Sequence, residues 1–226
     1  MNLKDILEEE IKKIKPSDEE MKYLQSLTKI VIDRLERKIK RKKINAQVFI
    51  GGSLAKKTLI KKSKYDIDIF IRFDRAYSEL EIKKYMRKIF FFFRIPWFKV
   101  PGYKIKIKRV HGSRDYYKVI FKAHKNIVFE VVPTVKISNP KDARNVTDLS
   151  YFHVNYIKNK TSKDENLLNQ ILLAKSFCHA QKVYGAESYI KGFSGYSLEV
   201  LLCFYEDFKK FLTEITDVKE KLIIDP

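Results

Sequence analysis

The sequence predicts an α+β protein in which a small mixed sheet is followed by a helical segment. Between about residues 46 and 132, apolar residues fall in short runs with the two-residue period of strands, while residues 1–43 and those after about 148 show helical spacing. No internal repeat and no low-complexity linker interrupts the chain. We therefore expect a mixed α/β head over residues 1–147 and, over residues 148–226, the start of a helical central domain.

The first predicted element is an N-terminal helix. Ser17 and Glu20 form a capping-box pattern, and apolar residues recur every three or four positions behind it. These apolar positions are Leu24, Leu27, Val31, Leu35 and Ile39. We expect them to pack on the sheet and to leave the cations between Arg37 and Lys43 toward solvent. Those cations either contact RNA or merely complement the C-terminal end of the helix dipole.

The sheet is predicted from five runs with strand character. They cover residues 46–50, 66–73, 104–108, 116–122 and 127–132, and Pro133 is expected to end the last one. A short helical stretch is expected over residues 54–59, and a longer helix over 78–92 behind the capping box of Ser78 and Glu81. The run 104–108 alternates strictly between lysine and isoleucine. Its basic face either tracks a phosphate backbone or simply faces water.

Helical periodicity dominates the last third of the chain. One helix is expected from Leu167 through Phe177 to the turn at Tyr184 and Gly185. A glycine-containing break over residues 192–195 precedes a second helix, expected over residues 196–212.

The composition is that of a folded protein with a strong basic charge. The hydrophobic fraction of 45% and aromatic fraction of 13% argue against global disorder, and the formal net charge is +19. Such a charge favours a polyanionic partner such as nucleic acid, although a lysine-rich surface can also follow from codon bias. The two cysteines, Cys178 and Cys203, lie in apolar helical surroundings and are interpreted as buried thiols in a reducing compartment. With no secretion signal and no long apolar run, we expect a soluble cytoplasmic protein.

The chemistry is predicted from a glycine turn followed by an acidic strand. Gly51, Gly52 and Ser53 come after an apolar strand and before a short helix, so backbone N–H groups and a hydroxyl can face phosphate oxygens. Asp66 and Asp68 lie two residues apart in an otherwise apolar strand and therefore point to one side of it. The pair predicts a metal platform for nucleotidyl transfer.

Glu130 is the third candidate carboxylate. Two metal ions that bridge the attacking and leaving oxygens lie roughly 3.5–4 Å apart, and one pair of aspartates cannot fill both coordination shells. Glu130 stands between Phe129 and Val131 in an apolar strand, where an unpaired carboxylate would be costly. It either holds metal with Asp66 and Asp68, which we favour, or points to solvent on an edge strand, or pairs with one of the many lysines.

In this order, the glycine turn, the Asp-x-Asp strand and the later acidic strand resemble the nucleotidyltransferase superfamily that includes DNA polymerase β, poly(A) polymerases and CCA-adding enzymes. Five later blocks are similar to consecutive blocks of the archaeal (class I) CCA-adding enzymes. They begin at Glu130, Asp148, Leu172, Val183 and Gly192. With the turn and the acidic strand, these blocks cover nearly the whole chain.

The resemblance implies roles for matching positions. Asp66, Asp68 and Glu130 would hold two Mg²⁺ ions, and the turn would contact the nucleotide's phosphates. The further phosphate-binding positions implied are Gly52, Ser53, Lys56, Ser150, His153, Lys175 and Tyr184. Taken singly, each has a plainer interpretation; Lys175, for example, could be a surface lysine and Tyr184 a core aromatic. Lysine and histidine donate to phosphate oxygens, and serine and tyrosine offer hydroxyls.

Three departures from the family pattern stand out. The family usually has Glu-x-Asp on the central strand and Asp on the third, whereas this chain has Asp66, Asp68 and Glu130. Lys56 stands where the family commonly has arginine, which exchanges a bidentate fork for a point charge. The family also continues for about as long again, with regions that grip the tRNA acceptor stem and help to select the base. A second polypeptide supplying that half is our hypothesis, and a shortened chain is the alternative.

The resemblance therefore implies a CCA tRNA nucleotidyltransferase, or its catalytic subunit, that uses ATP and CTP with two Mg²⁺ ions and acts on a tRNA 3′ end. One alternative keeps the chemistry and changes the acceptor to another RNA, a protein or a small molecule. Another is a non-catalytic RNA-binding subunit that retains the fold. The sequence leaves open the acceptor, the nucleotide selectivity, the oligomeric state and which lysines contact RNA.

Overall fold

A computed structural model describes residues 2–91, 103–122, 126–218 and 223–224. Its contacts divide the chain into two compact units, each of which is described by itself. The sheet unit contains Asp18–Ala55 and Lys62–Phe152, and the helical unit contains Met1–Ser17, Lys56–Lys61 and His153–Pro226. The sequence expectation divides the chain once, at residue 147, whereas these contacts also group two early segments with the C-terminal helices.

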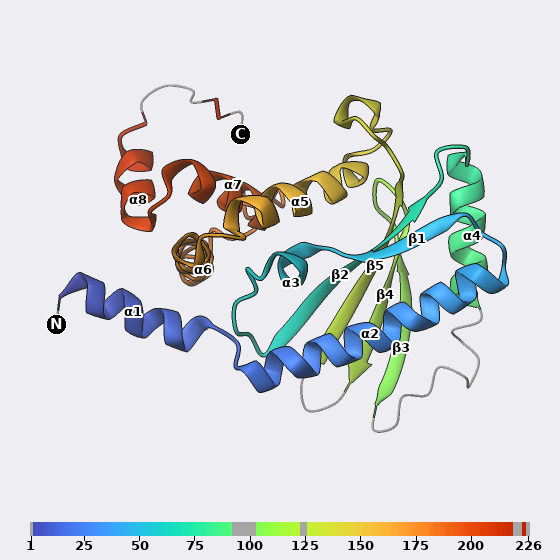
Figure 1. Cartoon of the computed structure of the whole chain (residues 1–226), viewed down its shortest axis with the longest axis horizontal. Coiled ribbons are helices and arrows are strands. Elements are labelled where there is room, and N and C mark those ends of the chain that lie inside the picture. Colours follow the sequence, from blue (N-terminus) through green and yellow to red (C-terminus); the bar gives the residue numbers. More distant parts are fainter. Residues whose placement is uncertain (1, 92–102, 123–125, 219–222, 225–226) are drawn as a thin grey trace. The chain divides into compact units, whose positions relative to one another are not determined.

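The sheet unit is built on a five-stranded mixed sheet with the strand order β1-β2-β5-β4-β3 (Figure 1). The strands are β1 (Ala46–Ile50), β2 (Lys64–Phe73), β3 (Lys104–Val110), β4 (Tyr116–Lys122) and β5 (Asn126–Val135). The central pair β2 and β5 is parallel, and every other neighbouring pair is antiparallel. The predicted mixed sheet is therefore confirmed.

One face of the sheet is buried under two helices. Alternate residues of β2, from Tyr65 to Phe73, are buried together with residues of α2 (Asp18–Arg41) and α4 (Glu79–Phe91). Figure 1 shows α2 running across the strands. The α2 positions in this core are Leu24, Leu27, Val31, Leu35 and Ile39, the same five that the helical spacing predicted. Asp66, Asp68 and Glu130 belong to the other face.

The helical unit has its own apolar core. It contains α1 (Leu3–Ile14), α6 (Glu165–Ala180), α7 (Gly195–Tyr205), α8 (Phe208–Thr216) and most of α5 (Ser150–Thr161). Ile14 of α1 and Ile60 of the 56–61 segment pack with buried residues of α6, α7 and α8. None of the described helices is long and apolar enough to cross a membrane.

The structure corrects several expected boundaries in the sheet unit: β2 begins two residues earlier and β3 ends two residues later than expected, and two further differences have a clear cause. β5 runs through Pro133 to Val135, because β4 ends opposite Val131 and leaves β5 without a partner on that side beyond this point. The short helix α3 covers Gly52–Lys56, not residues 54–59, since Lys57 takes a positive φ of 60° that ends it.

Two expected boundaries in the helical unit are also corrected. The expected helix 196–212 is two helices, α7 and α8, because Glu206 adopts a left-handed φ of 65° between them. The helix expected to start at Leu167 starts at Glu165 behind the N-cap Asp164 and ends at Ala180.

Candidate active site

The glycine turn of the sheet unit lies directly against Asp68. Gly52 has a φ of 56°, and a Cβ atom at this position would stand 1.8 Å from Asp68 Oδ2. The Gly51 N–H donates to the Asp68 carbonyl oxygen over 2.9 Å. Only glycine allows this approach of backbone to carboxylate. Ser53, half-buried in α3, follows at once, so the turn and the acidic strand form one structure.

The three predicted carboxylates lie on one face of two adjacent strands. Asp68 is directly opposite Glu130 in the parallel register of β2 and β5, and Asp66 is opposite Val128. Residues two apart on a strand point to the same side, so Asp66, Asp68 and Glu130 share the face that α2 and α4 leave open. The alternative that Glu130 lies on an edge strand is wrong, because β5 is flanked by β2 and β4.

Lysines pair with two of these carboxylates. Lys118 of β4 is opposite Glu130, and its Nζ lies 2.7 Å from Glu130 Oε1. That hydrogen bond is the main cause of the raised pKa of Lys118. Lys64 Nζ lies 3.2 Å from Asp66 Oδ1. Among the residues that the structure describes, no group of three or more His, Cys, Asp or Glu side chains is close enough to hold a metal ion as they are now arranged.

The donor chemistry nevertheless suits Mg²⁺. All three groups supply hard carboxylate oxygens, which this ion prefers. The Asp66 side chain is 52% exposed and that of Glu130 is 24% exposed, so neither is enclosed by protein. The Lys118 side chain is itself 31% exposed and can turn into water when a cation takes its place. We judge that these residues fit the metal that the resemblance implies.

Ser150 is also in the sheet unit, at the start of α5. The chain is anchored just before it by Asp148, which is 2% exposed and forms a salt bridge with Arg114. Asp148 also accepts the backbone N–H groups of Val135 at 2.7 Å and Asn145 at 3.1 Å. This buried network fixes the backbone that leads into Ser150.

A groove of about 940 Å³ lies elsewhere on the sheet unit, beside β1 at the edge of the sheet. Its walls include Arg37 and Lys40 of α2, together with Arg72, whose guanidinium stacks 4.1 Å over the Tyr151 ring. Some of the cations for which an RNA contact was left open therefore line a concave surface. None of the sequence-predicted site residues lines this groove.

The remaining predicted residues belong to the helical unit, and two of them meet at a carboxylate that the sequence reasoning missed. Lys56 and Lys175 both form salt bridges with Glu199 of α7, whose side chain is fully buried. Lys175 Nζ lies 2.6 Å from Glu199 Oε1, and the Thr58 hydroxyl donates to the same oxygen over 2.6 Å. The alternative of Lys175 as a surface lysine is wrong, since it is 3% exposed.

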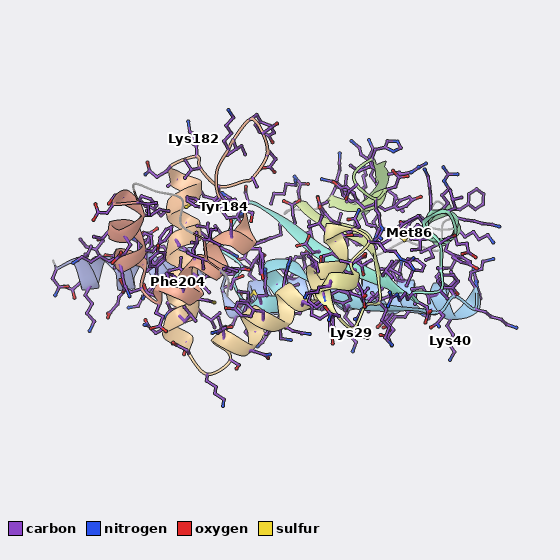
Figure 2. The ribbon with its side chains drawn as sticks, turned by 90° about the horizontal axis from the view of Figure 1, so that it is seen from above. Lys29, Lys40, Met86, Lys182, Tyr184 and Phe204 are labelled. Carbon is purple, nitrogen blue, oxygen red and sulfur yellow. The ribbon has the colours of Figure 1, made fainter. Side chains whose placement is uncertain are left out.

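His153 and Tyr184 flank this cluster. His153 stacks on Tyr196 with ring centroids 3.9 Å apart, and Lys56 Nζ lies 5.7 Å from the centroid of the same ring. Burial and then the nearby Lys56 charge lower the pKa of His153, so it is neutral at pH 7. Tyr184, labelled in Figure 2, follows α6, and its hydroxyl approaches Gly195 so closely that a Cβ there would stand 2.5 Å from it.

Each unit thus gathers part of the predicted set. The sheet unit holds the turn, the carboxylates and Ser150, and the helical unit holds Lys56, His153, Lys175 and Tyr184. Glu199 could have been found from the sequence, because it is a lone charge among Leu198, Val200 and Leu201, the same kind of signal that singled out Glu130. Thr58 and Tyr196 gave no comparable signal.

Comparison with known proteins agrees with the fold. Residues 32–139 match the model of the nucleotidyltransferase domain, and residues 169–226 match that of the second domain of tRNA nucleotidyltransferases. A noncanonical poly(A) polymerase in the GLD-2–GLD-3 complex superposes with a TM-score of 0.67 at 12% identity, over 91% of this chain and 59% of that one. A cytoplasmic RNA terminal U-transferase superposes with a TM-score of 0.58 at 15% identity, over 89% of this chain and 52% of that one. The matching domain model and the fold together define a polymerase β-like nucleotidyltransferase.

Curated relatives narrow the assignment further. The CCA-adding enzyme of Nanoarchaeum equitans is 36% identical over 79% of this chain and 41% of its own length. Those of Sulfurisphaera tokodaii and Methanocaldococcus jannaschii are 32% and 30% identical, over 97% and 99% of this chain and 48% of each enzyme. The chain belongs to the archaeal CCA-adding enzyme family. It spans about half the length of the curated relatives it matches.

Proposed function

We propose that this chain is a CCA tRNA nucleotidyltransferase, or the catalytic part of one, that transfers CMP and AMP from CTP and ATP to a tRNA 3′ end and releases pyrophosphate. The observation that carries the proposal is the register of the two parallel strands, in which Asp68 is opposite Glu130 with Asp66 on the same face, beside the Gly51–Ser53 turn. A turn that offers N–H groups next to clustered carboxylates suits a metal-bound triphosphate.

In the proposed reaction, the 3′ oxygen of the acceptor attacks the α-phosphorus of the nucleotide. The bond to the oxygen bridging the α- and β-phosphates breaks, and pyrophosphate leaves with that electron pair. The proton of the 3′ hydroxyl passes to a carboxylate of the trio. When bound by Asp66, Asp68 and Glu130, two Mg²⁺ ions would supply charge neutralisation at the transferring phosphoryl group.

The other predicted residues would hold the triphosphate in line for this attack. Backbone N–H groups at Gly52 and the Ser53 hydroxyl would donate to phosphate oxygens, with Ser150 as a further hydroxyl donor. Lys56 and Lys175 would contribute positive charge, and His153 and Tyr184 neutral donors. Most of the rate enhancement would come from positioning and from neutralised charge.

Acceptor binding would use the basic surface of the protein. The open face of the sheet carries Lys104, Lys106 and Lys108 of β3, which alternate with residues of the opposite face. A tRNA end crossing this face would release counterions. Action on tRNA would also place the protein in the cytoplasm. Because the relatives are about twice as long, we propose that a second polypeptide supplies further acceptor contacts.

The experiment that tests the proposal is incorporation of labelled CTP and ATP onto tRNA lacking its 3′ CCA, in the presence of Mg²⁺. The double variant Asp66→Asn/Asp68→Asn is the control for metal-dependent transfer. Incorporation that the double variant abolishes supports the proposal. Transfer to another RNA or to a protein but not to tRNA would overturn it in favour of a different acceptor, as would equal transfer by the double variant.

The proposed second polypeptide is tested separately, by mixing this chain with the C-terminal half of a CCA-adding relative. A complex that raises incorporation supports it. No complex and no gain in activity would overturn that part of the proposal.

A further inference from the structure

The carboxylate of Glu199 is the centre of the buried polar cluster in the helical unit. Its side chain is 0% exposed, and it projects from α7 into a region where Leu198 and Leu202 are also fully buried. One oxygen, Oε2, accepts from Lys56 Nζ. The other, Oε1, accepts from Lys175 Nζ and from the Thr58 hydroxyl. A single carboxylate therefore joins two cations that come from distant parts of the sequence.

Three acceptors lie within hydrogen-bond distance of the Lys175 ammonium group. An ammonium group has three N–H donors. Lys175 Nζ contacts Glu199 Oε1 at 2.6 Å, the Thr58 hydroxyl at 2.9 Å and the Thr58 carbonyl oxygen at 3.2 Å. A phosphate oxygen that binds Lys175 must replace one of these partners, and the neutral Thr58 hydroxyl is the cheapest to exchange.

The charges explain why a carboxylate is needed at this position. Burial alone would raise the pKa of Glu199, but the attraction of Lys175 and Lys56 prevails and lowers it, so Glu199 is ionised. Two lysines and one carboxylate leave a net charge of one positive unit in a buried site. Without the carboxylate, two ammonium groups would repel each other there, and release of one proton would relieve that repulsion.

We propose that Glu199 is a positioning residue for the triphosphate, holding the ammonium groups of Lys56 and Lys175 on its two oxygens so that both stay charged and side by side. The inference rests on the proposed function, because it gives the two lysines a nucleotide to bind. Glu199 does not touch the nucleotide itself. Its effect passes through the charge and the position of its two partners.

Among the residues that the structure describes, His153, Tyr196 and Cys203 also interact with Glu199. The pKa of His153 is lowered from 6.5 by burial and by Lys56. Burial raises the pKa of Tyr196 above 10 and that of Cys203 to about 11. None of the three changes its charge between pH 7.5 and pH 9.5 on this basis, so they do not account for a difference in pH dependence between the wild type and Glu199→Gln.

The test is calorimetric binding of Mg·ATP to the full chain at pH 7.5 and at pH 9.5, for the wild type, Glu199→Gln and Thr58→Val. Thr58→Val is the matched control, because it removes a hydroxyl from the same cluster and no charge. Between pH 7.5 and pH 9.5, we expect the affinity of Glu199→Gln for Mg·ATP to fall about tenfold more than that of the wild type. This factor corresponds to the loss of one charge-assisted hydrogen bond. Thr58→Val should follow the wild type. Identical pH dependence in Glu199→Gln and the wild type would overturn the inference.

Because Glu199→Gln leaves two cations in the core, thermal unfolding is measured in parallel. If that variant does not fold, the pair Lys175→Met/Glu199→Gln serves instead, since it keeps the net charge of the cluster. We expect this pair to bind Mg·ATP about tenfold more weakly at both pH values. Wild-type affinity in the pair would show that two lysines are not needed and would overturn the inference. If the wild type binds no Mg·ATP, the proposed function itself is refuted. That result differs from a failure of the inference, in which the wild type binds Mg·ATP and the variants behave as it does.

Discussion

Substitution of Gly52 by alanine tests the coupling between the glycine turn and the acidic strand. The new methyl group would stand 1.8 Å from Asp68 Oδ2 and 2.7 Å from its Cγ, closer than real Cβ atoms approach any neighbour. The carboxylate must therefore move by more than about 1 Å to reach an ordinary contact distance. The positive φ of 56° adds a backbone cost of about 1–2 kcal/mol for a residue with a Cβ atom.

These two effects have different consequences. The backbone term lowers the free energy of unfolding, whereas displacement of Asp68 moves a proposed metal ligand. A misplacement of about 1 Å at a reacting centre costs roughly a hundredfold in rate. We expect Gly52→Ala to remain folded, with a modestly lowered melting temperature, and to lose about a hundredfold in Mg²⁺-dependent nucleotidyl transfer, with nucleotide affinity in Mg²⁺ reduced as well.

The assay compares Gly52→Ala with Gly51→Ala by thermal unfolding and by Mg·ATP binding. Gly51→Ala is the matched control, because its methyl group would meet the Phe70 ring at 2.0 Å and not the carboxylate. Both variants should unfold at lower temperature, and only Gly52→Ala should lose Mg²⁺-dependent binding out of proportion. Equal losses of binding in the two variants, or full binding in Gly52→Ala, would refute the reasoning.

Three further perturbations follow from the structure. Arg114→Met leaves the buried Asp148 carboxylate without its cation and should cost about 3–5 kcal/mol in the free energy of unfolding, measured with denaturant. Lys106→Gln should weaken tRNA binding and reduce its salt slope by about one counterion, measured over a range of salt concentrations. Asp115 has its pKa lowered to about 2, chiefly by a hydrogen bond from Arg109. Because its pKa is lowered, ionised Asp115 stabilises the fold above about pH 4, and this stabilisation is lost as the pH falls toward 2. In Asp115→Asn, that part of the acid-induced loss of stability should be absent.

Each of these has a control and a contradicting result. Glu79→Gln touches the same arginine, but its side chain is 51% exposed, so it should cost less than about 1 kcal/mol; a cost equal to that of Arg114→Met would contradict the buried pair. Lys29 is exposed on α2, which covers the opposite face, and Lys29→Gln should leave tRNA affinity unchanged. Identical acid-unfolding profiles for the wild type and Asp115→Asn would contradict the prediction for Asp115.

Much of the sheet could be predicted because its local pattern is strong. The strands at residues 46–50 and 116–122 have the bounds that alternation predicted, and the Ser78–Glu81 capping box is confirmed by reciprocal hydrogen bonds. The break at Glu206 could not be predicted, because nothing in the residue type announces a left-handed backbone there. Pro133 misled the prediction because a strand that is central along most of its length becomes an edge where its neighbour ends.

The candidate site, like the fold, could be predicted from the sequence only in part. Glu130 could be recognised from the desolvation cost of a lone carboxylate in an apolar strand. Asp66 and Asp68 could be recognised from their two-residue spacing, which puts both on one side of a strand. The pairing of Asp68 with Glu130 could not be predicted from their own strands, because it depends on the register of β2 and β5, which are some sixty residues apart. Resemblance points to Lys56 and Lys175. The isolated charge of Glu199 in an apolar run is visible in the sequence, but its contact with both lysines depends on how α7 folds.

The central claim is that the carboxylates of β2 and β5 bind a metal-bound nucleotide. The most direct test is equilibrium binding of ATP and CTP to the chain, with and without Mg²⁺, for the wild type and Asp68→Asn. We predict binding that depends on Mg²⁺ in the wild type and is at least about tenfold weaker in Asp68→Asn, since one metal ligand has lost its charge. Binding that is the same without Mg²⁺, or the same in Asp68→Asn, would contradict the account.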